Sequence, residues 1–305
     1  MKLRTREGGV LPATPARFHR EAGFGSKCDS PALPGPERGL RRRKRKAFCG
    51  PWPLFVVALL IWSPRHANSE PPPEAPPVSS YAPADLLVKQ TQQIASELAE
   101  KVAGAEVYQS RQRTVKRLSS TLSVLALALE QHDRPHELKA AASGILHASQ
   151  RLAAAKDFAA AKAAEAELQA ALNSAGGGGT DDTPPAGWQK VAAMEPLMKE
   201  VAALKSKLRR GARGSRFKSR AAENAGHAAV MAVIGQAAIA DTHAVKDPAR
   251  LGEWYHLSAE MRDAAGAVSA GFQNKDLEAT KAALKRLEKN CKQCHTAFRV
   301  KLDSP

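Results

Sequence analysis

The sequence predicts an all-α protein made of two successive helical bundles, and three observations lead to this fold class. Apolar residues recur at helical spacing through most of the chain, among many Ala, Leu, Glu and Lys residues. No alternating or β-branched run long enough for a strand interrupts them. A Gly- and Pro-rich stretch at residues 176–187 divides this helical sequence into two halves, 84–175 and 188–305.

The N-terminal part of the chain, residues 1–69, is predicted to be an extension ending in a secretory signal peptide. A basic run at 41–46 is followed by a short apolar run at 54–62 and then by small and polar residues. The apolar run is too short for a membrane span. We therefore expect export to the periplasm and no stable membrane span after cleavage, with an uncleaved signal anchor as the rival. Residues 70–83 are Pro-rich and are predicted to be a spacer.

The charge of the chain is concentrated at the same end. Residues 1–69 hold 14 Lys and Arg against 4 Asp and Glu, so +10 of the net +16 lies there and about +6 lies on the rest. The remainder carries charges of both signs, few aromatic residues and no basic stripe with interleaved aromatic residues. We therefore do not expect nucleic-acid binding.

The second half is predicted to form four helices, for which local sequence signals are clear. Asp247 and Pro248 provide a cap and a first-turn proline for the third helix, and Asn274 or Asp276 can cap the fourth. Pro196 requires the first helix to begin near Glu195 or to kink. The predicted ranges are 190–209, 216–240, 249–272 and 276–301.

The last predicted helix carries the motif Cys291-Lys292-Gln293-Cys294-His295. Both cysteines continue an inner stripe of apolar residues spaced by three and four. Two thiols three residues apart can form thioethers with the two vinyl groups of one porphyrin, and the adjacent histidine can reach the iron. The other cysteines, Cys28 and Cys49, lie in the N-terminal segment. We therefore predict one covalently attached haem c.

Other uses of this cysteine pair are a disulfide, or half of a zinc site. Zinc would need two further ligands of suitable type. His227, His243 and His256 are present in the second half, but their spacing does not indicate a ligand cluster with the cysteines.

The two halves also resemble each other. The segment 156–164 (KDFAAAKAA) matches 275–283 (KDLEATKAA), and Leu168 then matches Leu287. In this register Cys291, Cys294 and His295 correspond to Leu172, Ala175 and Gly176. We therefore interpret residues 84–175 as a degenerate helical bundle that lacks the haem motif.

Residues 188–305 resemble the cytochrome c-prime family of four-helix-bundle haem proteins. The resemblance rests on the ending C-x-x-C-H-x-x-[FY]-R, which residues 291–299 fit, on Met198-Lys199-Glu200 in the first helix, and on the number of helices. It implies a four-helix bundle with one haem held by Cys291 and Cys294, with His295 as the proximal iron ligand. Arg299 matches the family's arginine beside the haem.

The resemblance also bears on the second axial ligand of the iron. In low-spin members of the family a methionine of the first helix occupies this position, and Met198 matches it. The iron ligands would then be His295 and Met198. Met194, one turn earlier, and an open position remain alternatives, because methionine at an inner helical position is more often a core residue.

We therefore expect an exported mono-haem cytochrome that transfers electrons. The alternative is a haem protein with an open iron position that binds or senses nitric oxide or carbon monoxide. No nucleophile and base pattern or phosphate loop is present, so we do not expect an enzyme. The expected partners are redox proteins, or a second copy of the chain in a homodimer. A basic loop could attract an acidic redox partner. Its residues are Arg209, Arg210, Arg213, Arg216 and Lys218.

Overall fold

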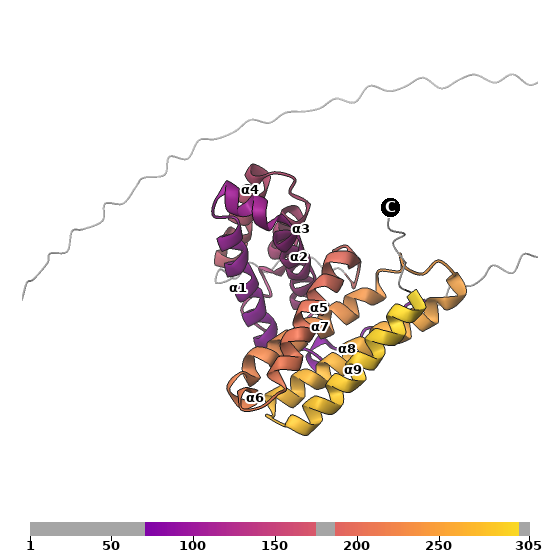
Figure 1. The fold of residues 1–305 in the computed structure, drawn as a ribbon. Coiled ribbons are helices and arrows are strands. Elements are labelled where there is room, and N and C mark those ends of the chain that lie inside the picture. Colours follow the sequence, from indigo (N-terminus) through magenta and orange to yellow (C-terminus); the bar gives the residue numbers. More distant parts are fainter. Residues whose placement is uncertain (1–70, 175–186, 299–305) are drawn as a thin grey trace, which may run out of the picture. The chain divides into compact units, whose positions relative to one another are not determined.

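A computed structural model describes residues 71–174 and 187–298 of the chain, and this part is helical (Figure 1). Helices and short 3-10 turns are its regular elements, and no strand occurs within these ranges. The all-α fold class is therefore confirmed for the described residues. Within the same ranges, no helix combines the length and the apolar character that crossing a membrane would need. The predicted signal peptide and Arg299 lie outside the described residues.

The first half contains a short 3-10 turn, Val78–Ser80, and then four longer helices that pack successively. In α4 the start is fixed by Asp157, whose carboxylate Oδ1 accepts a hydrogen bond from the Ala160 amide at 2.8 Å. The helices are α1 Ala84–Lys101, α2 Ala105–Glu130, α3 Ala142–Ala154 and α4 Phe158–Asn173.

The second half follows the predicted helix order, except that the helix predicted over 216–240 is divided at Arg220 into the short α6 and the longer α7. Its helices are α5 Met194–Gly211, α6 Arg216–Ser219, α7 Ala221–Ile239, α8 Leu251–Gln273 and α9 Leu277–Phe298. Pro196 lies in the first turn of α5, where a proline removes no helical hydrogen bond. Asp247 caps the 3-10 turn Pro248–Arg250 that leads into α8. Asp276 caps α9, because its Oδ1 accepts a hydrogen bond from the Ala279 amide at 3.0 Å.

The sequence repeat corresponds to a repeat of local structure. Asp157 and Asp276 hold equivalent positions and make the same cap to the amide three residues later. Leu168 and Leu287, matched in the same register, are both completely buried. The two helices then differ. Helix α4 ends at Asn173, whereas α9 continues past the equivalent position, Lys292, to Phe298.

Helix α7 lies at the centre of the described helices and is buried along nearly its whole length. It packs against α5 and α8 of its own half and against α1 and α2 of the first half. One hydrophobic cluster accordingly includes residues of both halves, among them Leu87, Leu125, Leu204 and Met231. A helix that is apolar on all sides needs neighbours on all sides. The two halves therefore share a core, and a self-contained four-helix bundle in the second half stays a prediction.

An ion pair also joins the halves within this shared core. Arg117 of α2 lies 3.2 Å from a carboxylate oxygen of Glu200 on α5, measured from Nη1 to Oε2. Glu200 is 5% exposed, and burial raises the pKa of its carboxyl group, an effect that the charge of Arg117 opposes. This pair is the type of buried contact in which removing one partner leaves an uncompensated charge.

Candidate functional site: the cysteine pair of the last helix

The cysteine pair lies in the last turns of α9, and both side chains are half-buried on its inner side. The inner stripe of α9 contains Thr280, Leu284, Leu287 and Phe298, all of which are buried. Cys291 and Cys294 continue this stripe, and neither forms a disulfide. The helix therefore presents two free thiols, one turn apart, toward the protein interior.

An apolar cluster surrounds this end of α9, and it brings together helices α5, α7, α8 and α9. Its buried members are Met194, Ala238, Ile239, Trp254, Tyr255, Leu257 and Phe298. Cys294 and Met198 both pack at the edge of this cluster. Cys291 packs against the larger core shared by the two halves, as Met198 also does. The structure thus gathers both cysteines and both methionine candidates around adjoining apolar surfaces.

Aromatic contacts give the cluster a fixed arrangement. The indole of Trp254 and the ring of Phe298 meet edge to face, with centroids 5.2 Å apart. The indole Nε1 donates a hydrogen bond to the Ala238 carbonyl at 2.9 Å, which ties α8 to the end of α7. The polar atom of a large buried aromatic is thereby satisfied, and its ring is held beside the last turn of α9.

The thiols are set in surroundings that favour their neutral form. Burial raises the pKa of both cysteines, and that of Cys294 reaches about 11, partly because Cys291 lies beside it. The positive charge of Lys205 on α5 partly offsets this effect at Cys291. Neutral thiols can face a large apolar group without leaving an unpaired charge.

His295 follows the pair directly and is exposed on the flank of α9. It is one turn beyond Cys291, so its side chain lies on the same side of the helix as that thiol. The order of two inward cysteines and a flanking histidine is the arrangement that the sequence predicts. Among the sequence-predicted site residues, Arg299 alone lies outside the part of the chain that the structure describes.

The two methionine candidates lie on successive turns of α5. Met194 is buried within the apolar cluster, at 8% exposed, whereas Met198 is half-buried at the junction of the cluster and the larger core. Side chains rather than closely packed backbones join α5 to α9, and one such link is Arg209 Nε to Glu288 Oε1 at 3.2 Å. Met194, Met198 and Cys294 all belong to or pack against the same apolar cluster, and the choice between Met198 and Met194 stays open.

The histidines considered as zinc partners do not join the cysteines. His227 is buried in α7, with Nε2 at 3.5 Å from Lys207 Nζ, and His243 Nδ1 lies 2.8 Å from a carboxylate oxygen of Asp241. Within residues 71–174 and 187–298 no three or more His, Cys, Asp or Glu side chains gather as a metal-binding group. The described residues therefore do not assemble the four-ligand zinc site that the cysteine pair could have begun.

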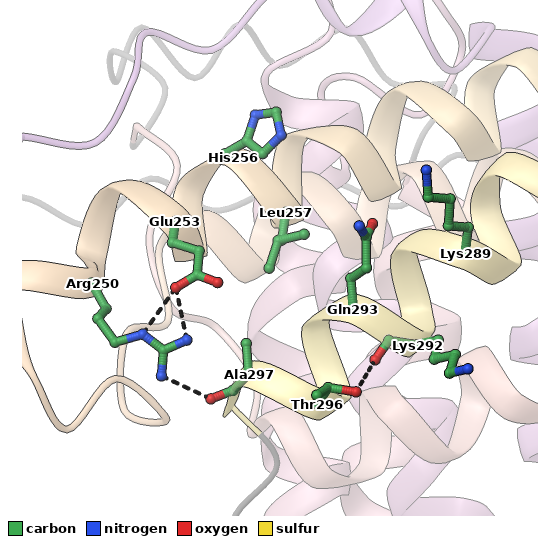
Figure 2. A pocket seen from close by; sticks show the side chains of 9 residues that line it. All are labelled: Arg250, Glu253, His256, Leu257, Lys289, Lys292, Gln293, Thr296 and Ala297. Carbon is green, nitrogen blue, oxygen red and sulfur yellow. Dashed lines mark hydrogen bonds and ion pairs between the residues drawn. The ribbon is translucent and has the colours of Figure 1, made fainter.

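Arg250 is a residue of this site that the sequence interpretation missed. Its Nη1 donates a hydrogen bond to the Ala297 carbonyl at 3.0 Å, and its guanidinium lies 4.5 Å from the centre of the Phe298 ring. Two further bonds, at 2.9 and 2.7 Å, join it to one oxygen of Glu253 (Figure 2). A cation at the last carbonyls of a helix is favourable. Arg250 therefore fixes the end of the helix that carries the cysteine pair.

An open pocket of about 850 Å³ lies between α8 and α9 beside this contact. Figure 2 shows Lys289, Lys292 and Gln293 projecting from α9, and His256 and Leu257 from α8.

The spacing of Arg250 and Glu253 on one helical turn was visible in the sequence. The contact from Arg250 to Ala297 joins residues 47 positions apart, so local spacing could not have indicated it.

Comparison with family models, with curated proteins and with solved structures finds no match to this chain. The assignment of the site therefore depends on the motif, its surroundings and the resemblance seen in the sequence.

Proposed function

We propose that the chain is an exported cytochrome of the c-prime type, with one covalently attached haem c, and that its function is electron transfer. The observation that carries this proposal is the common apolar surrounding of Cys294, Met194 and Met198, which come from helices at opposite ends of the second half. A motif that had arisen by chance would need neither an inward-facing thiol pair nor a nearby thioether.

The proposed roles follow from chemistry and placement. Cys291 and Cys294 attach the porphyrin through thioethers, His295 is the proximal ligand, and Met198 is the favoured second ligand. A haem iron held in this way changes between the ferric and ferrous states and so carries one electron. The apolar cluster excludes water from one side of the site, while the exposed flank of α9 leaves an edge accessible to a partner. Export, proposed from residues 41–62, would bring the chain to the compartment where such attachment takes place.

The covalent attachment is tested by producing the exported chain in a host that attaches haem to C-x-x-C-H motifs. We expect haem to stay with the denatured protein through acid-acetone extraction. Cys291→Ala should leave a single thioether, and the double replacement Cys291→Ala and Cys294→Ala should lose all covalent haem. Haem that is extracted from the unaltered chain would overturn the proposal.

Electron transfer is distinguished from gas binding by absorption spectra of the oxidised and reduced protein, with and without carbon monoxide. We expect a low-spin spectrum that carbon monoxide does not change, and Met198→Ala should make the spectrum high-spin and sensitive to carbon monoxide. The matched replacement Met194→Ala should alter the spectrum little. A high-spin spectrum of the unaltered chain that responds to carbon monoxide would favour the gas-binding function instead.

A further inference from the structure

A small pocket lies where three helices from both halves of the chain meet. It has a volume of about 230 Å³ and is lined by α1 of the first half and by α5 and α7 of the second half. Pockets for drug-sized ligands usually measure about 300–1,000 Å³, so an occupant of this pocket is small. We call this feature the junction pocket.

The lining of the junction pocket includes three polar side chains that are almost completely removed from solvent. Gln90, Glu200 and His227 come from three different helices and are 5%, 5% and 7% exposed. Nδ1 of His227 and Oε2 of Glu200 are buried without a hydrogen-bond partner. The latter oxygen has the ion-pair contact with Arg117 described above. Buried polar atoms are normally hydrogen-bonded, so two unsatisfied atoms on the lining of one pocket indicate a site for a polar ligand.

Two exposed carboxylates complete the lining on the solvent side. Glu97 of α1 and Glu223 of α7 line the pocket, and neither makes an ion pair or a hydrogen bond among the described residues. The cation of the lining is Lys207, whose Nζ lies 3.5 Å from Nε2 of His227. A ligand in the pocket therefore meets carboxylates that no protein group neutralises.

The charges around the pocket do not cancel. Arg117 pairs with Glu200 from outside the lining, so three carboxylates face two cations, Arg117 and Lys207. His227 adds no charge near neutral pH, because burial lowers its pKa to about 4. The junction pocket therefore has an excess of one negative charge, which a ligand with one positive charge would balance.

The α1 side of the pocket offers neutral polar groups. Nε2 of Gln90 donates a hydrogen bond to Oε1 of Gln93 at 2.6 Å. The remaining amide atoms, Oε1 of Gln90 and Nε2 of Gln93, make no hydrogen bond to another described residue. An amide oxygen and an amide nitrogen together suit a hydroxyl group, which both donates and accepts.

The spread of the acidic groups selects the kind of cation. Within residues 71–174 and 187–298 no three His, Cys, Asp or Glu side chains gather closely enough to hold one metal ion. An organic ammonium group instead carries several N–H donors, which can reach separate carboxylates and form strong charge-assisted hydrogen bonds.

We propose that the junction pocket binds a small organic ammonium compound that also carries a hydroxyl group. Its ammonium group donates to the carboxylates and balances the excess charge, and its hydroxyl group binds to the glutamine amides of α1. This inference goes beyond the proposed electron-transfer function and does not depend on haem attachment. Because the lining comes from both halves, the bound ligand joins α1 of the haem-less half to α5 and α7.

The test uses 3-aminopropan-1-ol as the probe, together with two compounds of similar length. Propane-1,3-diol has a hydroxyl in place of the ammonium group, and 3-hydroxypropanoate has a carboxylate there. Thermal unfolding of the full exported chain is measured near neutral pH and at constant ionic strength. The ammonium probe at about 10 mM should raise the melting temperature by about 3 °C, because a ligand that binds the folded state stabilises it. The diol and the carboxylate should leave the melting temperature unchanged.

Two matched variants locate the binding. Glu223→Gln removes a carboxylate of the pocket from the first turn of α7, whereas Glu106→Gln removes an exposed carboxylate outside the pocket from the first turn of α2. Both lose the same interaction with a helix N-terminus, so their melting temperatures without the probe should be similar. In calorimetric titrations Glu223→Gln should weaken binding of the probe about tenfold, the loss expected for a charge-assisted hydrogen bond. Glu106→Gln should change it by less than about twofold.

Three results would overturn the proposal. Equal stabilisation by propane-1,3-diol would show that the ammonium group is not recognised. Equal stabilisation by magnesium chloride would show that the pocket accepts any cation. Equal weakening in Glu223→Gln and Glu106→Gln would show that binding follows the overall charge of the protein rather than the junction pocket.

Discussion

Among individual residues, Arg250 joins the end of α9 to the start of α8. It caps the Ala297 carbonyl, pairs with Glu253 and lies over the Phe298 ring. We expect Arg250→Ala to lower the free energy of unfolding by about 1–2 kcal/mol, since it removes a helix-end cation and a cation–π contact. Chemical denaturation measures the loss, and hydrogen exchange of the amides of residues 294–298 should quicken.

The matched control for that change is Arg213→Ala, which removes an exposed arginine that makes no ion pair among the described residues. It should leave both measurements unchanged. Equal destabilisation by the two replacements would show that the contacts of Arg250 contribute no more than an ordinary surface charge.

His227 makes the stability of the fold depend on pH. Burial lowers the pKa of this histidine to about 4, and the charge of Lys207 acts in the same direction. Because the pKa of His227 is lower in the folded state than in the unfolded state, its contribution to stability is complete above the unfolded-state pKa, near 6.5. That contribution is lost as the pH falls toward the folded-state pKa, near 4. The shift corresponds to a loss of up to about 3 kcal/mol on acidification. Denaturant unfolding at neutral and acidic pH should show it.

Other ionisable groups share the surroundings of His227, and controls separate their effects. Glu97, Glu200, Lys207 and Glu223 line the same small pocket between α1, α5 and α7. The raised pKa of Glu200 acts in the opposite direction, since it gives stability that is lost as pH rises. His227→Gln should flatten the acidic loss of stability, and Glu200→Gln should steepen it. An unchanged pH profile in His227→Gln would rule out this histidine as the cause.

Between elements, α7 and α8 pack so closely that a glycine is needed at the contact. A Cβ atom at Gly235 would lie 2.6 Å from the backbone nitrogen of Arg262, and backbone cannot easily move aside. We expect Gly235→Ala to cost about 1–3 kcal/mol of unfolding free energy through overpacking. The control is Gly187→Ala, where nothing lies within 4 Å. Thermal unfolding of the two variants compares them, and similar melting temperatures would contradict the prediction.

Most helices of the second half could be predicted because their sequence signals are local. Apolar spacing indicated α9, and the caps at Asp247 and Asp276 marked helix starts. The central position of α7 could not be predicted in this way, since a helix that is apolar on every side has no periodicity to show which face is covered. The cysteine pair was visible as a motif, whereas the long-range contact of Arg250 to its helix was not.

For the whole molecule, the shared core predicts that the halves do not behave independently. Helices α1 and α2 cover part of α7, and Arg117 balances the buried charge of Glu200. Deleting residues 71–186 while keeping the N-terminal 70 residues should therefore expose apolar surface and leave a buried carboxylate without its partner. We expect a chain that aggregates or melts at a clearly lower temperature, measured by size-exclusion chromatography and thermal unfolding.

Supplying residues 71–186 as a separate exported chain should partly restore the melting temperature of the deleted chain, because α1 and α2 then cover α7 again. A deleted chain that remains monomeric and melts at the same temperature as the full chain would show that the second half is independent.

The place of α9 in the fold has a consequence for biogenesis. It is the last of the described helices, and among them its closely packed backbone neighbour is α8. A peripheral terminal helix can detach at a fraction of the free energy of global unfolding. Under the proposed function, an attachment enzyme would reach the thiol pair by displacing α9 while the rest of the core stays formed. Haem attachment would then require the rearrangement of one helix rather than the refolding of the whole protein.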